Sequence, residues 1–229
     1  MDLPRAQFDA HMAILAGRGD AWTLDEALAS LQRPDPPPRD PVVVTFDDGS
    51  SDFADTVVPI VVEHRIPVTL YLATGYVDEQ RALPHGGRPL SWAALRDARS
   101  TGMVTVGSHT HGHTVLARVP ASMAGEELDR SIELIGAHLG AAAEHFAYPK
   151  GLAGSPAVAA EVRKRFRSAA LAGTRTNTYG ATDPYRLHRS PVQAADGIRW
   201  FDAKLRGGMA LEGDVRRALD RVRYARATT

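Results

Sequence analysis

A chain of 229 residues, 44% of them hydrophobic, can bury one sizeable core and is typical of a single α/β domain. Its 27 basic and 27 acidic side chains give a formal net charge of zero, which argues against a nucleic-acid partner or an anionic membrane surface. The sequence contains no cysteine, which excludes disulfides and thiolate zinc sites. Any bound metal must therefore use His, Asp or Glu.

The first twenty residues carry charges at Asp2, Arg5 and Asp9, where a secretory signal needs an apolar core. No run in the sequence approaches the roughly 18 apolar residues that a membrane-spanning helix needs. We therefore expect no signal peptide and no membrane span, and we expect a cytoplasmic protein.

Residues 1–40 differ in pattern from the rest of the chain. Two apolar stripes predict two short helices before residue 33: Phe8, Met12 and Leu15, then Leu24, Leu28 and Leu31. Thr23 and Glu26 have the spacing of a capping box for the second helix. The segment RPDPPPRD at 33–40 holds four prolines, so it can be neither helix nor central strand. We interpret residues 1–40 as a helical segment and linker that pack on a main domain of residues 41–229.

The main domain alternates between apolar runs and amphipathic stretches. Runs such as VVVTF and VTLYLA lack the alternation of a half-exposed strand, so they favour strands covered on both faces. We predict strands at 41–46, 67–73, 103–107, 145–148 and 168–172. We predict helices at 52–64, 91–99, 122–139, 155–166, 197–206 and 211–224, with Ser91 and Ser155 as N-caps. This order implies parallel βαβ units in an open sheet or a barrel.

Two polar clusters directly follow predicted strands. Asp47 and Asp48 stand side by side at the end of the first strand, where neighbouring carboxylates repel each other. His109 and His113 follow the third strand, and Gly112 between them favours a tight turn over a helix. Because the carboxyl ends of parallel strands meet at one edge, we expect the two clusters to lie together.

A divalent cation would offset the repulsion between the two carboxylates. Asp48, His109 and His113 form a ligand set that is common in catalytic zinc sites and also accepts iron, cobalt or nickel. Water on such an ion becomes acidic near neutral pH, and Asp47 beside it can take the proton as a general base. The pattern predicts hydrolysis of an amide or ester. The alternative is an ordinary strand-end turn with structural histidines, and His111 should point away from the other two.

These residues resemble two motifs of the polysaccharide deacetylase family, carbohydrate esterase family 4. TFDDG at 45–49 and HTHGH at 109–113 match Thr-Phe-Asp-Asp-Gly and His-Ser/Thr-x-x-His, and the likeness runs from about residue 4 to 206. The resemblance implies an irregular barrel of seven or eight parallel strands. It also implies a bound divalent metal, for which zinc is the first expectation and cobalt, nickel or iron are the alternatives. It also implies Asp47 as the base and Asp48, His109 and His113 as metal ligands.

The third motif of the family, Arg-x-Pro-aromatic, is altered here to FAYPKG at 146–151. This stretch resembles a branch of the family with an FAYP loop. The resemblance implies that the backbone N–H of Lys150 is an oxyanion donor, and that Tyr148 and Pro149 line the acetyl pocket. A buried strand-end tyrosine is the alternative for Tyr148.

The last two motifs are incomplete. No Asp-Trp pair is present, and His188 in YRLHRSPV at 185–192 is the candidate for the family's histidine acid, with a spacing from Leu187 that is one residue short. A histidine in a surface loop is the alternative. We predict that Arg189 orients Asp47, or steadies charge, in place of the arginine that the third motif lacks.

We predict a metal-dependent hydrolase that removes N-acetyl groups from amino sugars in a polysaccharide or glycan precursor, such as a glycan of the cell envelope. An N-acetylated glycan is then the partner. Two alternatives remain. A small-molecule amidohydrolase would close its pocket with residues 75–90 and 174–188, and a catalytically silent glycan-binding domain would keep the metal for stability.

Overall fold

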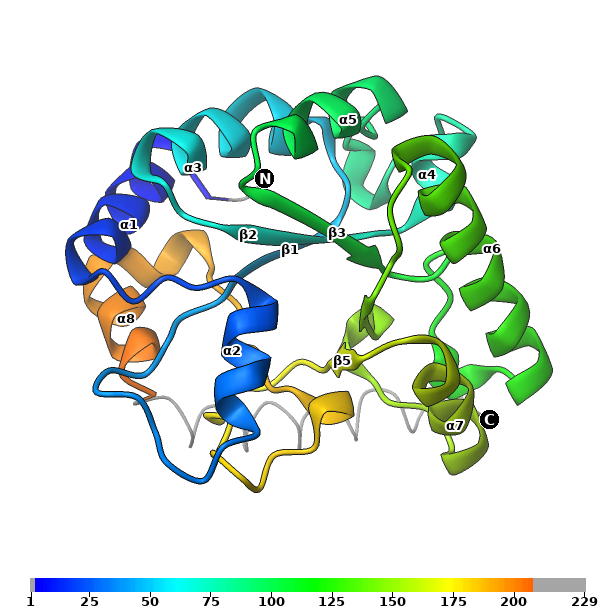
Figure 1. The fold of residues 1–229 in the computed structure, drawn as a ribbon. Helices are drawn as coiled ribbons and strands as arrows, with labels where there is room; N and C mark the ends of the chain where they lie inside the picture. The colour runs from blue at the N-terminus through cyan, green and yellow to red at the C-terminus, as the bar shows by residue number, and fades with distance from the viewer. Residues whose placement is uncertain (1–2, 208–229) are drawn as a thin grey trace.

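The computed structural model describes residues 3–207 and shows a curled parallel sheet surrounded by helices (Figure 1). The strands are paired in the order β1-β2-β3-β4-β5, and every pair is parallel. The strands are β1 (Val44–Asp48), β2 (Val68–Leu72), β3 (Val104–Ser108), β4 (His145–Ala147) and β5 (Ser168–Ala170). The predicted α/β barrel of parallel strands is confirmed.

Short strand-like segments extend the sheet at both edges. Ala21 forms a parallel bridge with Val42, just before β1, and Leu187 forms one with Ala170 of β5. Beyond that bridge, the carbonyl of Arg189 accepts a hydrogen bond from the N–H of Gly173. With these two segments the arc reaches seven strand positions in the described residues, although only five form named strands.

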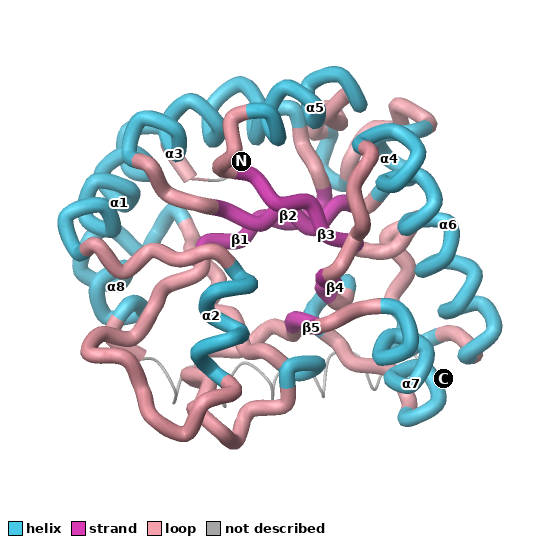
Figure 2. Tube along the Cα trace, viewed as in Figure 1, coloured by secondary structure: helices cyan, strands magenta, loops and turns pink. Residues whose placement is uncertain are grey.

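Helices surround the arc, and most of them cover its outer face (Figures 1 and 2). They are α1 (Arg5–Arg18), α2 (Leu24–Leu31), α3 (Val58–His64), α4 (Thr74–Asp78), α5 (Trp92–Ser100), α6 (Ala121–Leu139), α7 (Pro156–Arg165) and α8 (Gly197–Leu205). The helix predicted at 52–64 begins with a π-helical turn, η1 (Phe53–Val57). Single 3₁₀ turns are η2 (Pro84–Gly86), η3 (Leu116–Arg118), η4 (Pro149–Gly151), η5 (Pro184–Arg186) and η6 (Ala194–Asp196). The helix predicted at 211–224 lies outside the described residues.

The predicted helix starts agree with the hydrogen bonds at the helix ends. Thr23 and Glu26 form the full capping box of α2, because each side chain accepts a hydrogen bond from the other's backbone N–H. Ser91 and Ser155 accept the backbone N–H groups of Ala94 and Val158 at the starts of α5 and α7. Local sequence therefore determines where these helices begin.

The strands separate two apolar layers. Phe46, Leu70 and Val106 face outward into the main core beneath the helices. The intervening residues face the barrel interior, where Tyr71, Ala147, Ala170 and Leu187 pack against Leu24 and Leu28 of α2. Helix α2 thus fills the open side of the arc between β1 and β5 (Figure 2). The predicted boundary at residue 40 stays a prediction.

A glycine in β3 makes room for the interior packing. A Cβ on Gly107 would lie 2.9 Å from a ring carbon of Tyr71 and 2.6 Å from the carbonyl oxygen of His145. Both distances are shorter than normal contacts, so a larger residue would force these groups apart.

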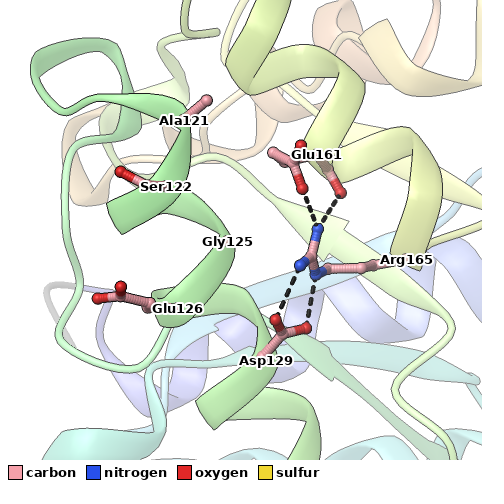
Figure 3. Close-up of a pocket in the computed structure, with 7 residues that line it drawn as sticks. All are labelled: Ala121, Ser122, Gly125, Glu126, Asp129, Glu161 and Arg165. Atoms are coloured by element: carbon pink, nitrogen blue, oxygen red, sulfur yellow. Dashed lines mark hydrogen bonds and ion pairs between the residues drawn. The ribbon is translucent and has the colours of Figure 1, made fainter.

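A pocket between α6 and α7 is occupied by ion pairs (Figure 3). Arg165 binds both carboxylate oxygens of Asp129, at 2.6 and 2.8 Å, and one of Glu161 at 2.6 Å. Gly125 lets the guanidinium cross α6, since a Cβ there would lie 3.3 Å from its nitrogen. We assign these residues to the packing of α7 on α6.

Within residues 3–207, no helix combines the length and hydrophobicity needed to cross a bilayer. The predicted cytoplasmic location stays a prediction.

Candidate active site

The end of β1 turns two adjacent carboxylates toward the same edge of the sheet. Asp48 adopts a left-handed conformation with φ of 73°, and Gly49 follows with φ of 97°. Asp47 and Asp48 therefore do not alternate as they would in a straight strand. One oxygen of each lies near Nε2 of His109, at 3.9 Å from Asp47 and 3.6 Å from Asp48.

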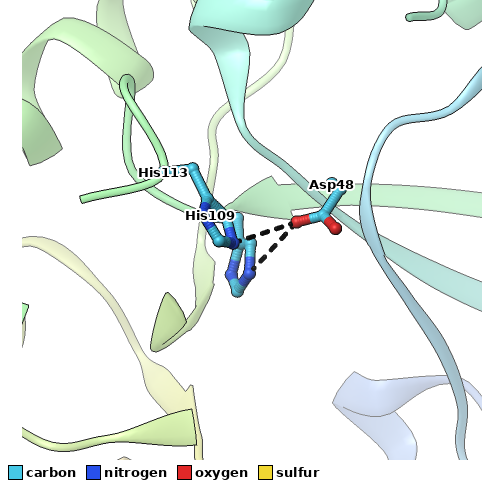
Figure 4. A group of neighbouring side chains, drawn as sticks. All are labelled: Asp48, His109 and His113. Carbon is cyan, nitrogen blue, oxygen red and sulfur yellow. Dashed lines mark ion pairs between the residues drawn. The ribbon is translucent and has the colours of Figure 1, made fainter. Parts of the chain in front are cut away.

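The loop after β3 brings the two predicted histidine ligands to Asp48 (Figure 4). Nε2 of His113 lies 3.2 Å from Oδ1 of Asp48, the same oxygen that faces His109. The possible ligand atoms of the three residues lie within 4.8 Å of one another. The predicted convergence of these two sequence clusters is therefore observed.

Hydrogen bonding fixes the tautomer of His109. Its Nδ1–H donates to the carbonyl oxygen of Ala147 at 2.7 Å, which leaves the lone pair of Nε2 directed at Asp48. Burial lowers the pKa of His109 despite the nearby charges of Asp47 and Asp48, so the ring is neutral at neutral pH.

The Asp48 carboxylate fits the same role. Its Oδ1 is buried without a hydrogen-bond partner, although it faces two imidazoles. Loss of hydration raises the pKa of Asp48, but His113 and His109 outweigh that effect and keep the pKa below its usual value. A buried anionic oxygen between two imidazole nitrogens suits a divalent metal ion.

Arg189 holds the other carboxylate. Its guanidinium donates to both oxygens of Asp47, at 2.7 and 3.0 Å, and also to Thr45 Oγ1 at 3.1 Å. The guanidinium lies 5.2 Å from the centre of the Tyr71 ring, and its Nε donates to the carbonyl of Leu171. The fork therefore has a fixed orientation, and it holds the Asp47 carboxylate with one oxygen 3.9 Å from Nε2 of His109.

The charge of Arg189 also keeps Asp47 ionised. Loss of hydration raises the pKa of Asp47, but Arg189 and His109 together lower it below its usual value. The contact predicted between Arg189 and Asp47 is thus present, whereas a catalytic effect of Arg189 stays a prediction.

The FAYPKG stretch ends β4 and turns sharply. Lys150 is exposed and left-handed, with φ of 59°, and Pro149 before it is buried. The Tyr148 ring is only 2% exposed and packs edge-on against Phe146 at 5.0 Å, in the core beneath the helices. The structure therefore places Tyr148 in the core, as the alternative of a strand-end tyrosine expects, and its contact with the acetyl group stays a prediction.

Two further histidines lie on other faces. His188 stands between Leu187 and Arg189, which both face the barrel interior, so its side chain points to the opposite face of this extended segment. Its backbone exchanges two hydrogen bonds with Asn177. His111 lies against Thr74 of α4, with its Nδ1 at 3.0 Å from the hydroxyl oxygen, in agreement with the prediction that it points away.

Sequence reasoning missed the wall that α4 forms beside His113. The Tyr76 ring centre lies 6.1 Å from the His113 ring centre, and Arg81 stacks over Tyr76 at 4.9 Å. The available signal was position, because TGYVD at 74–78 directly follows the predicted strand at 67–73 and so reaches the same edge of the sheet.

A scan against protein-family models matches residues 35–169 to the model described as polysaccharide deacetylase. The match covers more than half of the chain and includes both aspartates and both histidines of the site. The chain belongs to the polysaccharide deacetylase family. A comparison with curated protein sequences gives no match.

Several solved structures have the same fold as this family member. The Streptococcus pyogenes deacetylase PplD in complex with acetate is 17% identical, with a TM-score of 0.78, covering 89% of this chain and 87% of that one. IcaB from Ammonifex degensii is 24% identical, with a TM-score of 0.76 over 88% and 89% of the chains. BC0361, a polysaccharide deacetylase from Bacillus cereus, is 21% identical, with a TM-score of 0.73 over 89% and 62%.

Proposed function

We propose that this polysaccharide deacetylase is a metal-dependent hydrolase that removes N-acetyl groups from amino sugars in a glycan or glycan precursor. One observation carries the proposal: the buried Oδ1 of Asp48 lacks a hydrogen bond and faces two imidazole nitrogens, beside an Asp47 that Arg189 holds in place. This arrangement separates a cation-binding carboxylate from one that is available for proton transfer.

Asp48, His109 and His113 would hold the ion, with zinc as the first expectation from two imidazoles and one carboxylate. When bound, a divalent metal ion supplies a Lewis acid that polarises the acetamide carbonyl and acidifies water. The carbonyl of Ala147 keeps Nε2 of His109 unprotonated for this purpose.

Asp47 is the general base of the proposed reaction. Its ionised carboxylate takes the proton of the attacking water, and Arg189 keeps the accepting oxygens in one orientation. The departing nitrogen then needs a proton. Because His188 points to the face opposite Arg189, we assign the return of that proton to Asp47, so that acetate and a free amino sugar result.

The backbone N–H of Lys150 is the proposed donor to the oxyanion. Only the main chain is needed for this role, which is compatible with a lysine at the position of the family's aromatic residue. The left-handed conformation of Lys150 reorients the peptide that follows Pro149.

The exposure of the site favours a chain over a small molecule. The Asp47 and Asp48 side chains remain 34% and 38% exposed. In a small-molecule enzyme the 75–90 segment would close the pocket. Here its end is bound to the segment after β1, because the N–H of Ser51 donates to the carbonyl of Arg88 at 2.8 Å and Ser50 forms a β-bridge with Pro89. An open edge can accept one sugar of an oligosaccharide.

Acetate release tests the proposal. Metal-restored wild type should release acetate from oligomers of N-acetylglucosamine, and Asp47→Asn should lower turnover by about 10²–10⁴-fold while metal affinity is retained. Asp97→Asn, an exposed aspartate on α5, is the matched control and should behave as wild type. A wild type that binds metal yet deacetylates nothing in a broad panel of acetylated amines would instead identify a catalytically silent domain.

A further inference from the structure

The loop that carries His113 contains two unfavourable backbone conformations. Thr110 and His113 are left-handed, with φ of 67° and 58°, although neither is glycine. Such conformations persist only where the surrounding contacts enforce them. The position of the His113 ring therefore depends on the groups that hold this loop.

Helix α4 holds one side of the loop through backbone contacts. The N–H of Gly75 donates to the carbonyl of His111 at 2.8 Å, and that of Thr74 donates to the carbonyl of Thr110 at 3.3 Å. These bonds fix residues 110 and 111, which leaves the residue before His113 to be held from another direction.

Helix α6 supplies that contact through Glu127. The N–H of Gly112 donates to Oε2 of Glu127 at 2.7 Å, a charge-assisted hydrogen bond that is short for this type. Glu127 lies on the face of α6 that points at the barrel, between Ala124 and Ser131, which are both buried. The hydroxyl of Ser131 also forms a hydrogen bond with that of Ser108 at the end of β3. The same face of α6 therefore contacts the loop at Ser108, where it begins, and at Gly112, just before His113.

The fit around Gly112 is close. A Cβ on Gly112 would lie 3.2 Å from Oε1 of Glu127 and 3.4 Å from Oγ1 of Thr114. The carboxylate therefore touches the backbone one residue before His113, and a displaced Gly112 would move the imidazole with it.

We infer that Glu127 is a positioning residue, which holds His113 in its ligating geometry by accepting the N–H of Gly112. The inference rests on the proposed metal site. The contact requires a side-chain acceptor oxygen at position 127 that is far enough from the backbone to meet the N–H of Gly112. Glu127→Gln therefore keeps the hydrogen bond, Glu127→Ala removes it, and the side chain of Glu127→Asp is one methylene too short.

Metal affinity and cobalt spectra test this role. The dissociation constant for Zn²⁺ should rise about 10–100-fold in Glu127→Ala and Glu127→Asp, the range for lost outer-shell partners. The visible spectrum of the Co²⁺ protein should change in both, and Glu127→Gln should stay near wild type in both measurements. The Gly112 amide of the metal-free protein should exchange with solvent faster in Glu127→Ala and Glu127→Asp.

The control is Glu126→Ala, which removes an exposed glutamate from the next position of α6 and should change none of these values. If Glu127→Ala fails to fold, Glu127→Asp against Glu127→Gln still separates reach from polarity. Wild-type affinity in Glu127→Asp, or a Glu127→Gln protein as weak as Glu127→Asp, would overturn the inference alone. A wild type that binds no divalent metal would overturn the proposed function, and the inference with it.

Discussion

The two ends of the barrel contain similar sets of potential metal ligands. At the carboxyl end of the strands lie Asp48, His109 and His113, and at the amino end lie Asp25, Glu144 and His145. In both sets the ligand atoms lie within 4.8 Å of one another. Spacing alone therefore does not distinguish them.

Charge compensation distinguishes the two sets. At the amino end, Arg167 pairs with Asp25 at 3.0 Å and Glu144 at 2.9 Å, so the protein already supplies the cation. His145 bonds through Nδ1 to Ser168 and lies 3.3 Å from Asp25 through Nε2.

At the carboxyl end, Arg189 binds Asp47 and leaves Asp48 to the two imidazoles. Within residues 3–207, Asp48 has no ion pair with lysine or arginine. Charge compensation, rather than ligand distance, therefore favours the set at the carboxyl end as the proposed metal site.

The largest effect should come from the ligand that lacks a protein cation. Asp48→Ala should weaken Zn²⁺ binding by more than the roughly 10–100-fold that loss of an outer-shell partner costs. Asp25→Ala should leave the affinity unchanged, because its carboxylate already binds Arg167. Titration calorimetry of both proteins decides between the ends, and a larger loss in Asp25→Ala would reverse the assignment.

The next largest effect should be the difference in turnover between variants of Arg189 and variants of Arg167. Arg189→Ala should lower turnover about 10²-fold with little change in KM, because Asp47 loses its orientation. Arg189→Lys should recover only part of this, since an ammonium cannot bind both oxygens. Arg167→Ala should release acetate at the wild-type rate. Equal rates for all four proteins would remove the positioning role of Arg189.

The smallest effect concerns pH at the amino end. Burial lowers the pKa of His145, and the opposing attraction of Asp25 does not cancel it, with Arg167 and Glu144 also nearby. Below the ordinary value of 6.5, the unfolded chain therefore binds a proton that the folded chain resists, so this stabilisation is complete above that pH and is lost as pH falls.

Urea unfolding of the metal-free proteins measures this contribution. Between pH 7.5 and 5.5 the free energy of unfolding should fall more in wild type than in His145→Gln. The other histidines titrate in both proteins, so the difference reports the contribution of His145 alone. Parallel curves for the two proteins would show that His145 does not resist protonation.

The sequence sufficed where the signal was local. Strand ends, helix caps and the spacing within TFDDG and HTHGH are local signals, and the rule that parallel strands end at one edge joins the two motifs, so the barrel and the Asp48, His109 and His113 cluster could be predicted. The contact between Arg189 and Asp47 spans 142 positions, and its only signal in the sequence was the missing arginine of the third motif.

Other features depend on which face a residue presents. Tyr148 was open to two roles, because strand alternation places it on the same face as Phe146 without showing that this face is the outward one. Glu127 looks like any glutamate of an amphipathic helix until the loop it touches is placed beside it. Neither apolar periodicity nor the capping residues predict the π-helical turn η1.

The most direct measurement is anomalous diffraction at the zinc absorption edge, from crystals of the metal-restored protein. We expect a peak about 2.0–2.2 Å from Oδ1 of Asp48 and from Nε2 of His109 and His113. A peak at Asp25, Glu144 and His145 with none at Asp48 would contradict this expectation.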